Sequence, residues 1–577
     1  MQIVKNHKSD YVIVIPENPT KAQRYAASEL AGYLTRISGA ILPIVTADAA
    51  PKAREIVIGK TGREGTPCEC GLTNDGYILK TEGEKLFILG ENDRGNLYGV
   101  YGLLEDQLGC RFLARGVEKI PERADLCLNE LDVTRCSVLE YRETFWYDPE
   151  TDPTFAIKRG FNGSIYNNYT EEIGNGIEYY YFGHSFFQYV SPDEYFDEHP
   201  EYFSMVDGKR IREYTQLCLT NPEVLEITKR KLRQNIIDHP EAKIFSIAQM
   251  DWYNPCQCPE CARVDAEEGC YAGTLIRFIN ALAASVADEF PHVIIDTFAY
   301  QYSRQAPRIT KPLPNVCVRI CSIECCFSHP LGECNETASF KDRTKAGATF
   351  QQDMDDWKRI SSRNFVWDYT TNYKHYLAPF PNIHVLKDNI RYFVDHNVTG
   401  LFEQGNAETV SGEFGELRAY LISKIMWDLD VDVEQAMDEF LTGYYGLAAA
   451  PIKTYIKLLK DYVVDNNIHV GIYHDPELYL PVDMIPKMDA LWDEAESLAK
   501  DDEELERVRK SRMQVRYLKL YIMPVDTPDH DRLVDEFVAD LHKHGIEAIR
   551  EGMPLEQSIR RMRNGNLRVS DRNPELD

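Results

Sequence analysis

Between residues 137 and 430, short apolar segments alternate with stretches of helical periodicity. This alternation predicts parallel β/α units, because a helix that follows each strand lets the next strand pair in the same direction. Eight units over about 290 residues predict a (β/α)8 barrel. The third strand has a competitor, QLCLTNP at 216–222. The predicted strands lie at 141–146, 163–167, 179–183, 244–248, 293–298, 316–323, 364–367 and 400–402.

The segments on either side of the barrel differ from it in pattern. The N-terminal segment carries short strands and a helix that Thr20 can cap and Gly39 can end, with a second helix at 96–108. After residue 430 the periodicity is helical. We expect an N-terminal α/β domain over 1–132, a catalytic barrel over 133–430 and a helical domain over 431–577.

Composition excludes several classes of partner. The net charge of -28 disfavours binding to nucleic acid or to anionic membranes. No apolar run reaches the roughly 18 residues of a membrane span, and the apolar run at 11–16 is too short for a signal peptide. The 15 cysteines are an odd number, so we expect mostly reduced thiols and a cytoplasmic protein. The sequence favours no particular oligomeric state.

Polar and aromatic residues follow the predicted strands at the end where a barrel carries its active site. Sugar rings stack on aromatic side chains, and their hydroxyl groups require polar partners. This combination therefore indicates an oligosaccharide-binding mouth. The candidate substrate-binding residues are Trp146, Asp148, Asn168, His184, Asp251, Trp252, Tyr300, Tyr302, Trp367, Asp368, Tyr369, Gln404 and Asn406.

Two glutamates at strand ends are the candidate catalytic residues. Glu324 follows the sixth predicted strand, and Glu403 follows the eighth. Glycosidic hydrolysis usually requires two carboxyl groups on opposite sides of the bond, one protonated and one ionised. Alternate strands of a barrel can place such a pair across one mouth. Each carboxylate could instead cap a helix or join an ion pair, and the tryptophans could belong to the core.

The motif CQCPEC contains Cys256, Cys258 and Cys261 at the spacing of metal ligands. A structural zinc site requires four ligands, and the fourth would be Cys270 or a distant residue. The alternative is a cluster of thiols without metal, which we favour. We therefore expect no metal and no cofactor.

Several segments resemble the DUF4838 family, namely IAQMDWYNPCQCPECARVD, IDTFAYQYSRQAP, VRICSIECCFSHPL, VWDYTTNYKHYLAPFPN and LFEQGN. Part of that family is classed as glycoside hydrolase family 163, with endo-β-N-acetylglucosaminidase activity on N-glycans. The N-terminal domain resembles that of family 20 hexosaminidases and family 67 α-glucuronidases. The resemblance implies a retaining glycosidase with Glu324 as general acid/base and Glu403 as nucleophile, or with these roles reversed.

We therefore expect a glycoside hydrolase that acts on β-N-acetylglucosamine-containing oligosaccharides. Three alternatives remain open at this point. The first is an α-glucuronidase or another exo-glycosidase, which a cationic residue in the sugar pocket would favour. The second is a carbohydrate-binding protein without turnover, and the third is a metalloenzyme that uses the cysteine cluster.

Overall fold

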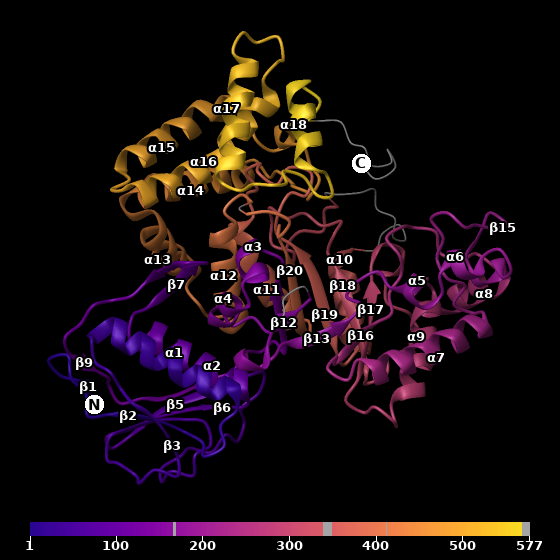
Figure 1. Ribbon diagram of the computed structural model, residues 1–577. Helices are drawn as coiled ribbons and strands as arrows, with labels where there is room; N and C mark the ends of the chain where they lie inside the picture. Colours follow the sequence, from indigo (N-terminus) through magenta and orange to yellow (C-terminus); the bar gives the residue numbers. More distant parts are fainter. Residues whose placement is uncertain (166–168, 338–348, 411, 568–577) are drawn as a thin grey trace.

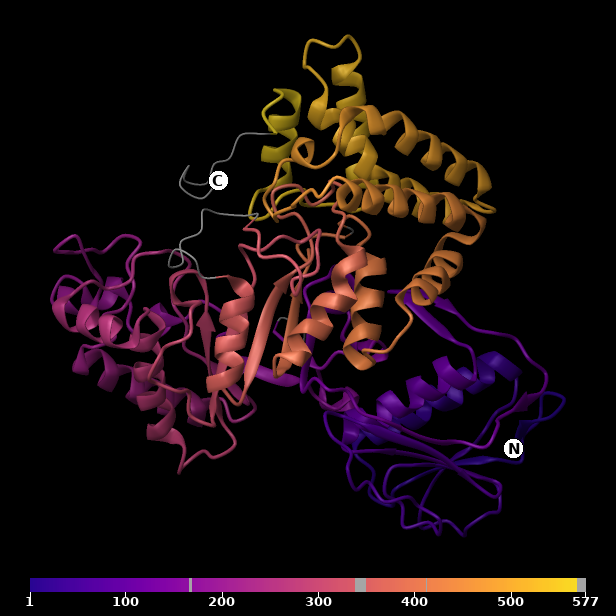
Figure 2. The ribbon, with the colours of Figure 1, turned by 180° about the vertical axis from the view of Figure 1, so that it is seen from behind.

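The computed structural model describes residues 1–165, 169–337, 349–410 and 412–567. Figures 1 and 2 show an N-terminal α/β part, a central barrel and a group of C-terminal helices that packs above the barrel. Cys68 and Cys70 form a disulfide, and the other thirteen cysteines are free, as expected for most of them. In the described part of the chain, no single helix has the length and apolarity of a membrane span, although α8 (Pro259–Glu268) and α9 (Ala272–Val286) pass that test together as a pair bent by 100°.

Six strands of the N-terminal part form a sheet in the order β10-β5-β6-β4-β2-β3. Helices α1 (Lys21–Ser38) and α2 (Asp93–Gly102) lie on one face of it (Figure 1). The strands and strand pairs of this part are β1 (Gln2–Val4), β2 (Val12–Ile15), β3 (Ile44–Thr46), β4 (Glu55–Ile58), β5 (Tyr77–Glu82), β6 (Lys85–Gly90), β7 (Arg111–Ala114), β8 (Val117–Lys119), β9 (Leu126–Cys127) and β10 (Asp132–Arg135).

The predicted start of α1 is confirmed, whereas the predicted start of α2 is a few residues too late. Thr20 caps α1 as predicted, because its hydroxyl oxygen accepts a hydrogen bond from the Gln23 backbone N–H at 3.1 Å. Helix α2 begins before the predicted residue 96. Its cap is Asn92, whose side chain accepts from the Gly95 N–H at 2.9 Å. A π-helical turn, Leu103–Gln107, continues α2 toward its end.

All eight predicted barrel strands are present, and they pair in parallel in the order β11-β20-β19-β18-β17-β16-β13-β12. The third is confirmed as β13, whereas the competing segment at 216–222 forms no strand. The strands are β11 (Tyr141–Thr144), β12 (Gly163–Ser164), β13 (Ile177–Tyr180), β16 (Ile244–Ser246), β17 (Ile294–Ala299), β18 (Val316–Cys321), β19 (Asn364–Tyr369) and β20 (Val398–Gln404).

The two end strands of this sheet, β11 and β12, meet in a short seam that nearly closes the barrel. The Asn162 N–H donates to the Arg142 carbonyl oxygen at 3.0 Å, and the Arg142 N–H donates to Asn162 Oδ1 at 2.8 Å. Asp75, from the N-terminal part, accepts from Arg142 Nη2 at 2.9 Å and from Asn162 Nδ2 at 2.8 Å. A carboxylate of another part of the chain therefore holds both residues of the seam.

Helices surround the barrel and form the C-terminal part. The barrel region holds α3 (Tyr147–Thr151), α4 (Pro153–Lys158), α5 (Phe186–Tyr189), α6 (Pro192–Tyr195), α7 (Pro222–Asp238), α8 (Pro259–Glu268), α9 (Ala272–Val286), α10 (Phe350–Ile360), α11 (Leu386–Asp395) and α12 (Gly415–Trp427), with a hairpin of β14 (Met205–Val206) and β15 (Lys209–Arg210). The C-terminal part holds α13 (Val433–Tyr445), α14 (Ala449–Asp465), α15 (Ile485–Leu498), α16 (Asp502–Ile522), α17 (His530–Lys543) and α18 (Leu555–Arg563).

Candidate functional site at the barrel mouth

Aromatic rings form a layer inside the barrel below its mouth. The Trp367 ring lies 5.1 Å from Phe182, 5.7 Å from Phe298 and 4.9 Å from Phe402, between ring centroids. These residues come from different strands and loops, so their contacts identify the faces of β17, β19 and β20 that point inward. Trp367 is partly exposed, and its Nε1 donates to Gln404 Oε1 at 2.6 Å. The mouth therefore has an aromatic floor with a tryptophan and an amide at its surface.

Three polar residues that the sequence predicted meet above this floor. The Tyr300 hydroxyl group donates to Asp251 Oδ1 at 2.8 Å, and His184 Nε2 lies 3.9 Å from the same oxygen. His184 Nδ1 lies 2.5 Å from the Gln249 carbonyl oxygen, which fixes the ring orientation. The side chains of His184 and Asp251 are 30% and 58% exposed. This cluster is therefore open to a ligand.

Glu324 lies beyond the end of β18 and is held by a cation. Arg304 Nη1 donates to Glu324 Oε2 at 3.0 Å, while Arg304 Nε donates to Asp353 Oδ2 at 2.7 Å. Both side chains of the Arg304–Glu324 pair are buried. A guanidinium at this distance favours the ionised form of the glutamate. Arg304 and Asp353 were not among the predicted site residues.

The carboxylates of Asp251 and Glu324 act on the same two neighbours. Burial raises the pKa of Tyr300 well above its usual range, and the charges of Asp251 and Glu324 raise it further. Burial likewise raises the pKa of Cys321, with smaller contributions in the same direction from Glu324 and Asp251. Asp251 is in hydrogen-bond contact with Tyr300, and Glu324 lies close enough for its charge to act on Tyr300 and Cys321, at the end of the barrel where β17 and β18 end.

Glu403 lies on the other face of its strand. Phe402 and Gln404 both contact the inward-facing Trp367, so the alternation along β20 directs Glu403 toward the surrounding helices. It is fully buried, and neither carboxyl oxygen has a hydrogen-bond partner among the described residues. Glu403 therefore points away from the face of β20 that contacts Trp367.

Asp368 is the neighbour of Glu403 on β19, directly opposite in register. Burial raises the pKa of Glu403 well above its usual range, and the nearby Asp368 adds to this. Burial also raises the pKa of Asp368 to about 7. The hydrogen bond that the Ser322 hydroxyl group donates to Asp368 Oδ1 acts in the opposite direction and lowers this pKa. Ser322 stands two residues before Glu324. Through Ser322, Asp368 therefore contacts the loop that carries Glu324.

Trp146 is packed against the segments that follow β19 and β20, and Asp148 contacts the N-terminal part through Arg115. Trp146 is buried, and its Nε1 donates to Thr370 Oγ1 at 3.1 Å. A Cβ atom added at Gly405 would stand 2.3 Å from the Trp146 ring. Asp148 accepts from the Arg115 N–H at 2.9 Å, and its pKa is raised to about 6 by burial and by Glu416.

The other predicted residues separate into mouth and surroundings. Tyr369 is the last residue of β19, and its ring lies 6.2 Å from that of Phe327 and 5.9 Å from that of Tyr373, between centroids. Trp252 donates to the Thr215 carbonyl oxygen at 2.5 Å, Tyr302 lines a side cavity, and Asn406 is buried. Asn168 lies outside the described residues.

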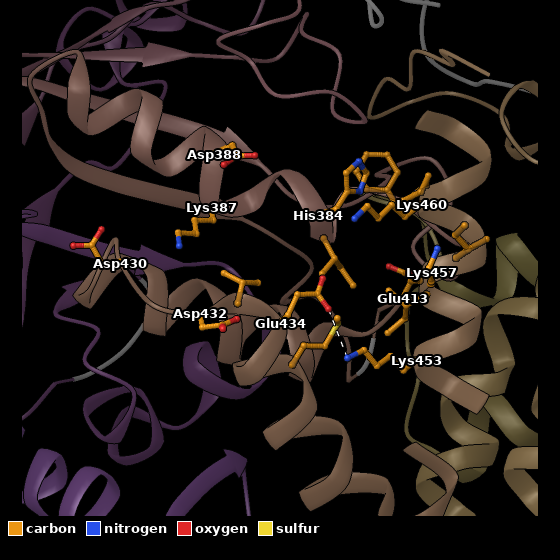
Figure 3. A pocket seen from close by; sticks show the side chains of 17 residues that line it. His384, Lys387, Asp388, Glu413, Asp430, Asp432, Glu434, Lys453, Lys457 and Lys460 are labelled. Carbon is orange, nitrogen blue, oxygen red and sulfur yellow. Dashed lines mark ion pairs between the residues drawn. The ribbon is translucent and has the colours of Figure 1, made fainter. Parts of the chain in front are cut away.

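A separate cavity of about 560 Å³ lies where α11, α13 and α14 meet (Figure 3). Its lysines are Lys387, Lys453, Lys457 and Lys460, and carboxylates surround them; Lys453, for example, lies 3.6 Å from Glu434. None of the residues of the mouth described above lines this cavity. The balance of charge gives it no preference for an anionic ligand.

The fold and the mouth define a (β/α)8-barrel protein with an acidic and aromatic opening. The chain belongs to the DUF4838 family, because a family model described as a domain of unknown function matches residues 112–457. A second model, the glycosyl hydrolase family 67 N-terminus, matches residues 3–103. No curated protein matches the sequence.

Solved structures share the architecture at low sequence identity. A family GH115 4-O-methyl-α-glucuronidase with specificity for decorated arabinogalactans aligns with a TM-score of 0.56 at 10% identity, over 100% of this chain and 79% of that one. An N-acetyl-β-hexosaminidase of Streptomyces plicatus aligns with a TM-score of 0.44 at 12% identity, over 76% and 91% of the two chains. The first of these alignments supports the barrel fold with its flanking parts.

Proposed function

We propose that this protein is a glycoside hydrolase whose active site is the barrel mouth. The observation that carries the proposal is the position of two carboxyl groups after the barrel strands β16 and β18, Asp251 hydrogen-bonded to Tyr300 and Glu324 held by Arg304, near the partly exposed Trp367. Two carboxyl groups with an aromatic platform match what glycosidic hydrolysis requires. The match of the N-terminal part to a family 67 model and the likeness to a glucuronidase fold add support.

Within this proposal, Glu324 is the ionised partner, acting as nucleophile or base, because Arg304 favours its carboxylate form. Asp251 is the proton donor. Asp251 is exposed at the mouth, where a bound sugar can reach its carboxyl group. The Tyr300 hydroxyl group orients the Asp251 carboxyl group, and His184 contributes a further polar contact to the substrate.

Glu403, which the motifs predicted as the second catalytic carboxyl, has one property of a proton donor, since its pKa is raised. Its position argues for Asp251 instead, because both Glu403 oxygens are shielded on the helix-covered face of β20. The substitution series below distinguishes the two residues.

For the substrate, we propose oligosaccharides that contain β-N-acetylglucosamine, in line with the resemblance to endo-acting members of the family. The charges at the mouth favour a neutral sugar over a uronic acid. Arg304 is engaged by both Glu324 and Asp353, and the ionised Glu324 would repel a second carboxylate. The glucuronidase likeness keeps acidic sugars as the competing substrate class.

The test is hydrolysis of aryl β-N-acetylglucosaminides, aryl glucuronides and N-glycan oligosaccharides by the wild type and by Glu324→Gln, Asp251→Asn and Glu403→Gln. We expect the first two variants to lose at least about a hundredfold in activity. We expect Glu403→Gln to keep most of it. Circular dichroism of each variant controls for folding.

Two results would overturn parts of the proposal. Loss of activity in a folded Glu403→Gln, with activity kept in Asp251→Asn, would return the proton-donor role to Glu403. A wild type that cleaves no substrate in the panel but binds an oligosaccharide by calorimetry would make the mouth a carbohydrate-binding site without turnover.

A further inference from the structure

The three cysteines of the CQCPEC motif meet a fourth, more distant cysteine beside the barrel. Cys256 and Cys258 lie in the loop after β16, Cys261 lies in the first turns of α8, and Cys218 lies ahead of α7. The Cys218 sulfur stands 3.6 Å from that of Cys258 and 3.9 Å from that of Cys261. All four ligand atoms lie within 4.8 Å of one another, and all four residues are buried.

These spacings are those of a tetrahedral thiolate site. Four sulfurs at about 2.3 Å from one zinc ion are about 3.8 Å apart. Two donors also point at the Cys256 sulfur, namely the Met205 N–H at 3.4 Å and Arg210 Nη1 at 3.6 Å. Donors around a sulfur ligand help to orient it toward a metal. A single disulfide would use two of the sulfurs and leave two without a role.

We propose that Cys218, Cys256, Cys258 and Cys261 bind one structural zinc ion. Thiolate ligands select zinc over the hard divalent ions, and four protein ligands leave no open position for chemistry. The ion would join the β14–β15 hairpin region to the loop after β16. Asp251 begins that same loop, so the metal stabilises a segment of the mouth without touching substrate. The sequence motif supplied three of the ligands, and the structure supplies Cys218 in place of Cys270.

The first test is the zinc content of the full-length protein, purified under reducing conditions from zinc-supplemented culture and measured by inductively coupled plasma mass spectrometry. We expect Cys218→Ser to lose one zinc ion per chain relative to the wild type. Cys270→Ser is the matched control, since Cys270 is half-buried close by but outside the cluster, and it should lose none.

A second measurement uses the wild type alone, so that a misfolded variant cannot decide the question. Cobalt exchanged into the protein should give the sulfur-to-cobalt charge-transfer bands and the intense visible bands of a tetrahedral thiolate site. A wild type without zinc, or an intact mass that shows a disulfide within the cluster, would overturn the proposal. So would equal zinc loss in Cys270→Ser and Cys218→Ser.

An independent observation points to a second metal site. Cys326, His329, Cys334 and His469 bring four ligand atoms within 4.8 Å of one another. The Cys326 sulfur lies 3.3 Å from His329 Nδ1, and the Cys334 sulfur lies 3.5 Å from His469 Nδ1. His329 Nε2 is buried and has no hydrogen-bond partner among the described residues. Two thiolates and two imidazoles are a regular ligand set for structural zinc.

This second cluster joins the mouth to the C-terminal part. Cys326 stands two residues after Glu324, and His469 follows α14. The two segments already pair next to the cluster. The Phe327 N–H donates to the Val470 carbonyl oxygen at 2.8 Å, and the Ser328 hydroxyl group donates to the Ile468 carbonyl oxygen at 2.6 Å. We infer that a zinc ion at this cluster fixes the loop that carries Glu324 against the C-terminal helices.

The second site is tested with His469→Ala and with His396→Ala as its control, a half-buried histidine outside the cluster. We expect the wild type to hold two zinc ions per chain, His469→Ala to hold one, and His396→Ala to hold two. The double variant Cys218→Ser/His469→Ala should hold none. Zinc content in His469→Ala equal to that of the wild type would overturn the second site and leave the first intact.

In case the variants misfold, thermal unfolding of the wild type gives a readout that needs no substitution. A chelator that removes both ions should lower Tm, and added zinc should restore it, because a metal that binds only the folded chain stabilises it. An unchanged Tm after complete removal of the metal would contradict a structural role for both ions.

Discussion

Glu403 and Asp368 lie opposite each other on neighbouring parallel strands, and their carboxyl groups form a pair buried between the barrel wall and its helices. Burial raises the pKa of both groups, that of Asp368 to about 7. Since unfolding would return both groups to ordinary carboxyl pKa values, the folded chain binds more protons than the unfolded chain between those values and the raised ones.

This difference predicts the direction of the pH dependence of stability. The stabilisation is complete below about pH 4, where both states are protonated, and is lost as pH rises through the folded pKa values. We expect the Tm of the wild type to fall from pH 5 to pH 8. Glu403→Gln should flatten that fall and raise stability at pH 8 by on the order of 1–3 kcal/mol. Identical pH profiles for the two proteins would contradict the ionisation argument.

Tyr300→Phe removes the hydroxyl group that donates to Asp251. If Asp251 acts on substrate, the loss of a hydrogen bond to a charged group should lower kcat by about 10- to 100-fold with little change in Tm. KM should change less than kcat, because the hydroxyl group orients Asp251 and is not itself a sugar contact in the proposed site. Tyr302→Phe is the control, since Tyr302 faces a side cavity, and an equal effect in both variants would count against the proposed site.

Arg304→Met leaves Glu324 and Asp353 as buried carboxylates without their cation. We expect the free energy of unfolding to fall by about 3–5 kcal/mol, measured by urea denaturation at neutral pH. Arg304→Met combined with Asp353→Asn should recover part of the loss, because one of the two uncompensated charges is then removed. A double variant as unstable as the sum of its parts would indicate that Arg304 stabilises through packing alone.

Trp367 and Trp146 were predicted together as sugar-stacking residues, and the structure places them differently. Trp367→Phe should raise KM for the best substrate several-fold while the fold is kept, since a smaller ring offers less stacking surface. Trp146→Phe should leave KM unchanged and lower the free energy of unfolding by roughly 1–3 kcal/mol, because the glycines around it leave no side chain to fill the space. A KM effect of Trp146→Phe would contradict its assignment to the core.

The barrel was predictable because each of its strands is a short apolar run and each run is followed by helical periodicity. Because these strands are buried on both faces, the sequence does not show which side chains at their ends face the mouth. In GLFEQGN, both faces of the strand are covered, so the alternation that would show whether Phe402 or Glu403 faces inward leaves no trace in hydrophobicity. The motifs therefore located Glu403 at a strand end but not on a face of the strand.

Contacts between distant segments account for the other omissions. Cys218 joins the CQCPEC cysteines from 38 positions before Cys256, and nothing in QLCLTNP marks a metal ligand. Arg304 and Asp353 meet Glu324 only because β17, β18 and α10 converge in the fold. Spacing within one motif can indicate ligands that a single loop supplies, whereas partners from other elements depend on the tertiary structure.

Asp75 accepts hydrogen bonds from both residues of the β11–β12 seam, Arg142 and Asn162. The N-terminal part is therefore not an appendage that can be removed without consequence for the barrel. If the chain were shortened to its barrel, the last strand interface would lose the carboxylate that joins its two sides, and a guanidinium buried at that seam would lose its counter-ion. We therefore expect the predicted boundary near residue 132 to separate two patterns of sequence rather than two independently folding units.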